Sequence, residues 1–222
     1  CRSGPSKDVT QRTNRLFINN QDNTFTEAAA QYALARTEHS VQASFFDYDL
    51  DGDLDMYLLN HPSQRTAATS LKAHMEAIKA GKIQTDIFFK NEKGRFVDAS
   101  KESGLVNFGF RHGIAVGDIN QDGYPDLYIS SDFDEPDLLE INQGDGTFVD
   151  QSQSYFDHIS FNSMGNEMVD MNNDGLLDLF VVDMASEDHY RSKAFMKSMD
   201  VDRFRALTAN GYQHQYMFNT LQ

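Results

Sequence analysis

Residues 47–55 read DYDLDGDLD, and this stretch decides how the chain of 222 residues is interpreted. Its pattern, D-x-[DN]-x-D-G-x-x-D, recurs at residues 118–126 and 170–178. Oxygen-bearing side chains stand at positions 1, 3, 5 and 9, and glycine stands at position 6. Ca²⁺ prefers about six to eight oxygen ligands, and glycine permits the left-handed turn that bends a loop around an ion. The three segments, called loops 1, 2 and 3, therefore predict calcium sites.

Five positions of each loop are predicted ligands: the side chains at positions 1, 3, 5 and 9, and the backbone carbonyl at position 7. In chain order they are Asp47, Asp49, Asp51, Asp53, Asp55, Asp118, Asn120, Asp122, Tyr124, Asp126, Asp170, Asn172, Asp174, Leu176 and Asp178. Mg²⁺ fits less well because it demands near-ideal octahedral geometry. Zn²⁺ is disfavoured because no His or Cys lies in the loops. The alternative is three acidic surface turns, but one ligand register repeated three times favours about three bound Ca²⁺ ions.

The loops differ from EF-hands in two ways. An EF-hand needs Glu at position 12, where this chain has Leu58, Ile129 and Val181. The flanking segments are short apolar, β-branched or aromatic runs, such as 43–46 before loop 1 and 56–59 after it. Runs of this kind are typical of strands. Each loop is therefore expected to join two strands.

A second motif precedes each loop. It consists of an apolar run, a polar turn rich in Asn, Asp or Gly, and a run that opens on Phe25, Phe96 or Phe148, which predicts a hairpin. Each Phe stands 22 positions before the first Asp of the following loop. Successive Phe residues are 71 and then 52 positions apart. Four predicted strands per repeat at this period indicate an all-β fold, a β-propeller whose blades stack on one another.

The loops, together with the Asn142–Phe148 hairpin NQGDGTF, resemble FG-GAP/VCBS repeats, the calcium-bearing blades also found in integrin α-subunits. The resemblance covers about residues 14–60, 86–150 and 160–184, and in detail is similar to bacterial surface proteins and lipoproteins. It implies seven blades in a complete ring and one calcium ion for each blade that carries the motif. Two features depart from the family pattern: Asp53 replaces an apolar residue, and the first two hairpin turns lack G-D-G.

The repeats place blade units at about 14–60, 86–134 and 137–184, with the start of another at 215–222. Two helical insertions are expected, at about 62–82 and 186–211, because apolar residues recur there at helical spacing. About three blades cannot close a ring, so the chain is expected to be a fragment of a larger propeller. Cys1 then lies within a connector. The alternative is that Cys1 is the acylated start of a lipoprotein.

Composition limits the function. The chain has 19 basic and 34 acidic residues and a net charge of −15, which disfavours nucleic acid as a partner. No apolar run is long enough for a transmembrane helix, and the sequence has no common hydrolase or nucleotide-binding motif. The seven His residues are scattered. Calcium sites of this kind suit an extracellular or cell-surface location, which would be the periplasm or outer membrane in a bacterium.

These observations predict a non-enzymatic, calcium-stabilised binding module that engages a protein or carbohydrate partner at the cell surface. One alternative is a scaffold for a polysaccharide-acting lyase or hydrolase whose active site lies outside these residues. Another is an adhesion protein in which calcium bridges to a carboxylate of the partner. The two insertions are candidate partner surfaces, although their apolar stripes are better explained by packing.

Overall fold

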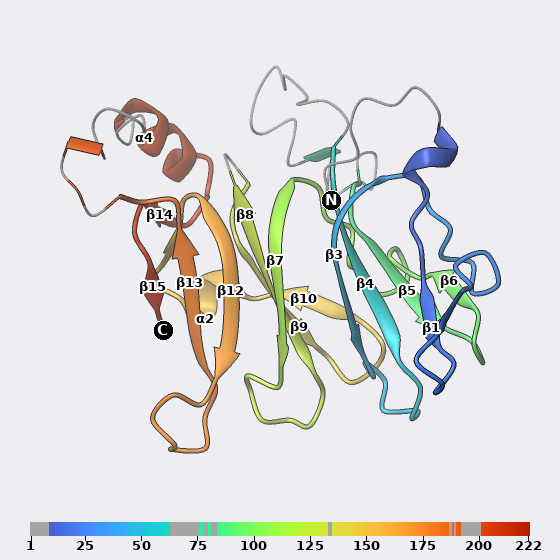
Figure 1. The fold of residues 1–222 in the computed structure, drawn as a ribbon. Coiled ribbons are helices and arrows are strands. Elements are labelled where there is room, and N and C mark those ends of the chain that lie inside the picture. Colours follow the sequence, from blue (N-terminus) through green and yellow to red (C-terminus); the bar gives the residue numbers. More distant parts are fainter. Residues whose placement is uncertain are drawn as a thin grey trace.

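Antiparallel sheets that stand side by side make up most of the molecule (Figure 1). The computed structural model describes residues 9–62, 76–77, 80, 84–132, 135–186, 188, 190–191 and 201–222. Cys1 and almost all of the predicted insertion at 62–82 lie outside these residues. The described chain is an all-β structure with few helices, as predicted, and its sheets form no closed ring.

The elements follow one another in a regular order. They are η1 (Val9–Arg12), β1 (Phe17–Asn19), β2 (Phe25–Glu27), β3 (His39–Phe46), β4 (Asp55–His61), β5 (Ile87–Asn91), β6 (Phe96–Asp98), β7 (Phe110–Gly117), β8 (Asp126–Asp132), β9 (Leu138–Asn142), β10 (Phe148–Asp150), α2 (Ser152–Tyr155), β11 (His158–Ser160), β12 (Ser163–Val169), β13 (Asp178–Asp183), α4 (Val201–Ala209), β14 (His214–Tyr216) and β15 (Thr220–Leu221).

Two sheets are complete four-stranded meanders, with the orders β3-β4-β5-β6 and β7-β8-β9-β10. A third sheet has the order β12-β13-β15, while β1-β2 and the parallel pair β11-β14 form two-stranded sheets. In all three larger sheets an acidic loop joins the first two strands. The last residue pair before the loop is equivalent in the three sheets: Phe46 opposite Asp55, Gly117 opposite Asp126, and Val169 opposite Asp178.

The sheets correct the predicted blade boundaries. The strand after each acidic loop pairs with the first strand of the next hairpin, so the sheets span 39–98 and 110–150 rather than 14–60 and 86–134. The constant interval of 22 residues, from Phe25 to Asp47 for example, therefore spans a crossover from one sheet to the next. Antiparallel strands that follow one another along the chain tend to pair in one sheet. The β8–β9 and β4–β5 connections follow this rule.

The core lies between the sheets. One apolar cluster joins the first two four-stranded sheets through residues such as Tyr57, Phe88 and Leu127. A second cluster joins β7–β10 to β12–β13 and includes Tyr128 and Leu179. Because neighbours cover both faces of a middle strand, β4 and β8 are buried along almost their whole length, while the outer strands β6 and β10 are largely exposed. This arrangement is typical of β-propeller blades.

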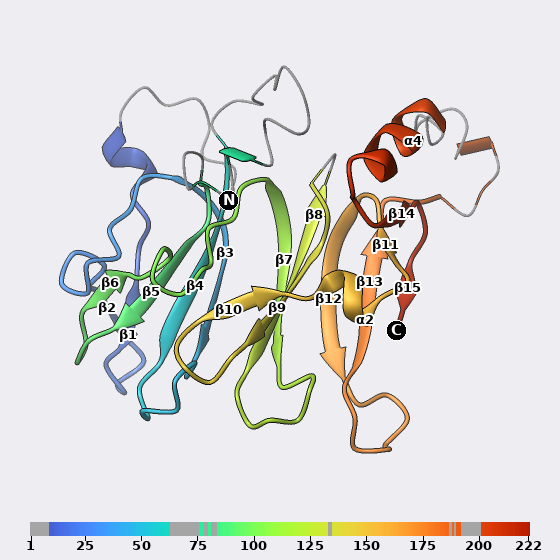
Figure 2. The same cartoon turned by 180° about the vertical axis from the view of Figure 1, so that it is seen from behind.

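The three acidic loops lie at one end of the sheets, and α4 lies at the other end (Figures 1 and 2). Helix α4 falls within the predicted second insertion, at 186–211. Leu207 is its buried apolar residue, and the chain turns at Gly211, which has a left-handed φ of 86°. The strand that follows α4 was not predicted: β14 pairs in parallel with the earlier strand β11.

Candidate calcium loops

The three loops share one hydrogen-bond network. In each, the carboxylate at position 1 accepts the backbone N–H groups of positions 5 and 6, at 2.8–3.1 Å. The carboxylate at position 5 accepts the N–H of position 7. Positions 4 and 6 have left-handed φ angles in every copy, at Leu50 and Gly52, Gln121 and Gly123, and Asn173 and Gly175. The left-handed glycine was predicted, whereas the left-handed residue at position 4 was not.

Position 9 ties loops 1 and 2 to their surroundings. The carboxylate of Asp55 accepts the N–H of Tyr48 at 3.2 Å and that of Asn91, in the next hairpin, at 2.8 Å. Asp126 accepts the equivalent groups of Ile119 and Asn142, at 2.9 and 2.8 Å. Both carboxylates are buried, and burial raises the pKa of Asp55 to about 6 and also raises the pKa of Asp126. Position 9 is therefore a structural acceptor as well as a predicted ligand.

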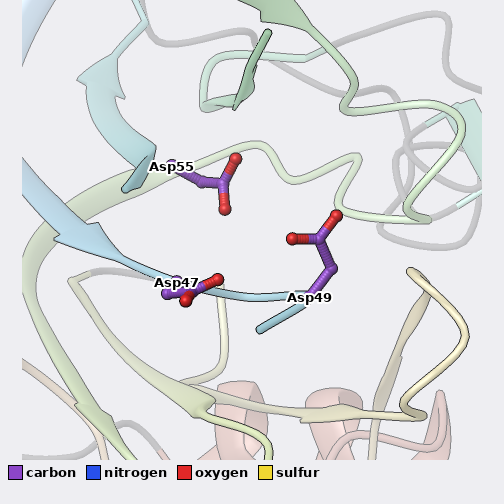
Figure 3. A group of neighbouring side chains, drawn as sticks. All are labelled: Asp47, Asp49 and Asp55. Atoms are coloured by element: carbon purple, nitrogen blue, oxygen red, sulfur yellow. The ribbon is translucent and has the colours of Figure 1, made fainter. Parts of the chain in front are cut away.

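In loop 1 the carboxylates converge. One oxygen from each of Asp47, Asp49 and Asp55 lies within 4.8 Å of the others, and the three side chains point toward a common centre (Figure 3). Asp49 Oδ1 and Asp53 Oδ1 are buried and accept no hydrogen bond. Burial, followed by repulsion from Asp51, Asp49 and Asp47, raises the pKa of Asp53. Buried carboxylate oxygens without donors are suited to a hard cation, so this set of residues fits Ca²⁺.

In loops 2 and 3 the residue at position 3 is Asn. The amide oxygen of Asn120 accepts the N–H of Asp122 at 3.1 Å, and that of Asn172 accepts the N–H of Asp174 at 2.8 Å. The amide group of Asn120 also donates to Asp122 at 2.9 Å. These loops carry the same backbone frame with two fewer acidic side chains than loop 1, because Asp49 and Asp53 have uncharged counterparts.

The loops also contact the neighbouring sheet. Asn142 donates to the carbonyl of Tyr48 in loop 1 at 2.8 Å, and Gln121 in loop 2 donates to the carbonyl of Gly175 in loop 3 at 3.1 Å. A Cβ added to Gly117 would lie 2.6 Å from a methyl carbon of Leu177. An ion bound in one loop would therefore stiffen the contact between adjacent sheets as well as the turn itself.

A buried polar cluster lies between the first two four-stranded sheets, away from the loops. The Arg111 side chain is 3% exposed and donates to the carbonyls of Pro136 and Phe108, with Nε 3.9 Å from Asp86. Glu140 accepts a hydrogen bond from Asn107 at 3.0 Å. Burial raises the pKa values of Asp86 and Glu140 to about 7 each, and Arg111 opposes both rises. Arg111, Glu140 and Asn107 also line a cavity of about 480 Å³.

Besides Arg111, sequence reasoning missed three features. Asp86 and Asp137 precede the first strand of a hairpin, and each accepts an N–H from the strand after the preceding loop, at 2.9 and 2.7 Å. Their recurrence before that strand was a usable signal. His61 and His112, 51 positions apart in the sequence, meet edge to face between adjacent sheets, with ring centres 4.9 Å apart. Lys90 forms an ion pair with loop 1, and no repeat of the sequence marks it.

Comparison with protein families gives two matches. A model described as an FG-GAP-like repeat matches residues 8–58, which hold the β1–β2 hairpin and loop 1. A model described as an FG-GAP repeat matches residues 110–147, from β7 through loop 2 to the β9–β10 turn. The chain carries FG-GAP repeats. Loop 3 lies outside both matches, yet it has the same left-handed positions as loop 2 and the same hydrogen bonds to the carboxylate at position 1.

No curated protein matches the chain significantly. In the part of the chain that the structure describes, no helix has the length and apolar character needed to cross a membrane.

Proposed function

We propose that this FG-GAP repeat protein is a calcium-stabilised interaction module that works at the cell surface or outside the cell, with one Ca²⁺ in each acidic loop. The family assignment supports an interaction role for the propeller blades. The observation that carries the calcium proposal is the identical frame of the three loops, together with the convergent carboxylates of loop 1. The ligands would be the fifteen predicted residues, with position 7 acting through its carbonyl.

In this proposal the ions act on structure rather than on a reaction. Bound Ca²⁺ supplies positive charge to clustered carboxylates, whose mutual repulsion opposes folding. The carboxylate at position 1 orients the loop by accepting two backbone N–H groups, and in loops 1 and 2 position 9 fixes the loop to the next hairpin. Asn142 and Gln121 link loops to neighbouring sheets. Ca²⁺ bound in the three loops would therefore hold the blades in a fixed relation to one another. That rigid scaffold would present a surface to a protein or glycan partner.

A calcium-dependent melting temperature tests the calcium part of this proposal. An ion that binds only the folded state at about 100 times its Kd adds about 2.7 kcal/mol of stability. For a domain of this size, the melting temperature should then rise by roughly 5–10 °C. We expect this rise when millimolar CaCl₂ replaces EDTA in differential scanning fluorimetry, with a smaller rise for MgCl₂.

A pair of matched variants tests whether the calcium-induced rise in melting temperature depends on the loops. Asp122→Ala should reduce the calcium-induced rise, because it removes a ligand and the acceptor for the N–H of Tyr124. Asp22→Ala removes an exposed acid from a hairpin turn outside the loops and should leave the rise unchanged. Equal melting temperatures in EDTA and CaCl₂ would contradict the proposal.

A further inference from the structure

Lys90 places a positive charge beside loop 1. The side chain extends from β5, and its Nζ atom lies 2.6 Å from Asp49 Oδ2. The ammonium group also lies 5.4 Å from the centre of the Tyr48 ring, within the range of a cation–π contact. The hydrogen bond to Asp49 is the main reason that the pKa of Lys90 is raised. The lysine is therefore fully charged at neutral pH and held by two neighbouring residues of the loop.

The second four-stranded sheet has no such cation. Phe89 pairs with Met56 in the first sheet, and Glu140 pairs with Leu127 in the second, so Lys90 corresponds to Ile141. The partner of Lys90 is also specific to loop 1, because the counterpart of Asp49 is Asn120. Loop 1 thus has two carboxylates that loop 2 lacks, and a lysine that contacts one of them.

We propose that Lys90 is an internal cation of loop 1, which supports the loop when no metal is bound and lowers its affinity for Ca²⁺. This inference rests on the proposed function, because it concerns the ion expected in that loop. The ammonium group occupies Asp49 Oδ2, while Asp49 Oδ1 accepts no hydrogen bond and remains available to a metal. A monovalent cation at one oxygen of a ligand repels a divalent ion bound at the other.

The consequence is that loop 1 depends less on calcium for its conformation than a loop with the same five carboxylates and no lysine. When calcium is scarce, the pair between Lys90 and Asp49 offsets part of the repulsion among the acids. When calcium is abundant, the same charge limits how tightly the ion is held. Lys90 therefore sets the calcium concentration over which loop 1 binds its ion.

Lys90→Met tests the inference, because methionine keeps an apolar stem over Tyr48 and removes the charge. We expect calcium titration calorimetry of the whole chain to show one site whose affinity rises by about tenfold or more, and the melting temperature in EDTA to fall. Lys90→Arg keeps the charge and should stay close to the wild type in both measurements. Lys101→Met removes an exposed lysine outside the loops and serves as the control.

The gain in calcium affinity is assigned to loop 1 by combining Lys90→Met with Asp51→Ala. The second substitution should abolish the gain. If Lys90→Met binds calcium with the same affinities as Lys101→Met while the wild type binds calcium, the inference about Lys90 is overturned and the proposed function stands. If the wild type and every variant fail to bind calcium, the proposed function is overturned and this inference with it.

Discussion

Replacing Asp126 by alanine is expected to lower the free energy of unfolding by about 3 kcal/mol, even in EDTA. The Asp126 carboxylate is 0% exposed and accepts two backbone N–H groups, from Ile119 at 2.9 Å and from Asn142 at 2.8 Å. Alanine leaves both donors without this acceptor. The first bond closes loop 2, and the second fixes the β9–β10 hairpin to it. Urea denaturation monitored by circular dichroism would measure the loss.

Asp178→Ala is the matched control for this prediction. Asp178 occupies the same position in loop 3 but is more exposed, and its carboxylate accepts the N–H of Met171 at 2.9 Å. We expect a loss of about 1 kcal/mol in EDTA. Both variants remove one proposed calcium ligand, so a difference between them in EDTA reports the structural role alone. Equal losses would show that the bond to Asn142 adds nothing to stability.

Replacing Arg111 by methionine is expected to cost about 3–5 kcal/mol at pH 8, because it removes the cation of a buried group of acids. Arg111 is 3% exposed, lies 3.9 Å from Asp86 and donates to the carbonyls of Pro136 and Phe108. Without the guanidinium group, both carbonyls lose a donor, and Asp86 loses its nearby positive charge. Chemical denaturation would measure the change, with the exposed Arg95→Met as the control.

The cost of Arg111→Met should depend on pH. The folded-state pKa values of Asp86 and Glu140 are about 7, above the unfolded values of about 4. Arg111 favours the ionised forms, so its removal raises the folded-state values further. The folded variant then holds protons that the unfolded chain releases, and its stability falls as pH rises through this window. We expect a smaller loss at pH 5.5 than at pH 8, and an equal loss at both would contradict this account of the cluster.

The local structure of the loops could be predicted from the sequence because it depends on residues close in the chain. Aspartates at positions 1 and 5 accept nearby N–H groups, and Gly52, Gly123 and Gly175 supply the left-handed turn. The strands beside them follow from their apolar runs. The FG-GAP resemblance, stated from the same residues, is confirmed by the family matches.

The blade boundaries could not be predicted from the same pattern, because spacing along the chain does not reveal which strands pair. The interval of 22 residues, from Phe25 to Asp47 for example, is constant because it is a crossover of fixed length between sheets. The sequence pattern alone places it within one blade. Lys90 and Arg111 were missed for a related reason. Each acts on residues at least 25 positions away, Lys90 on Asp49 and Arg111 on Asp86 and Pro136, and neither belongs to a repeated motif.

A count of bound calcium tests the central claim most directly. After dialysis against buffered millimolar CaCl₂, calcium measured by atomic emission should amount to about three ions per chain. Combining Asp122→Ala with Asp174→Ala should reduce the count by about two, because each removes a ligand from a different loop. A wild-type chain that retains no calcium, or a double variant that retains as much as the wild type, would contradict the account.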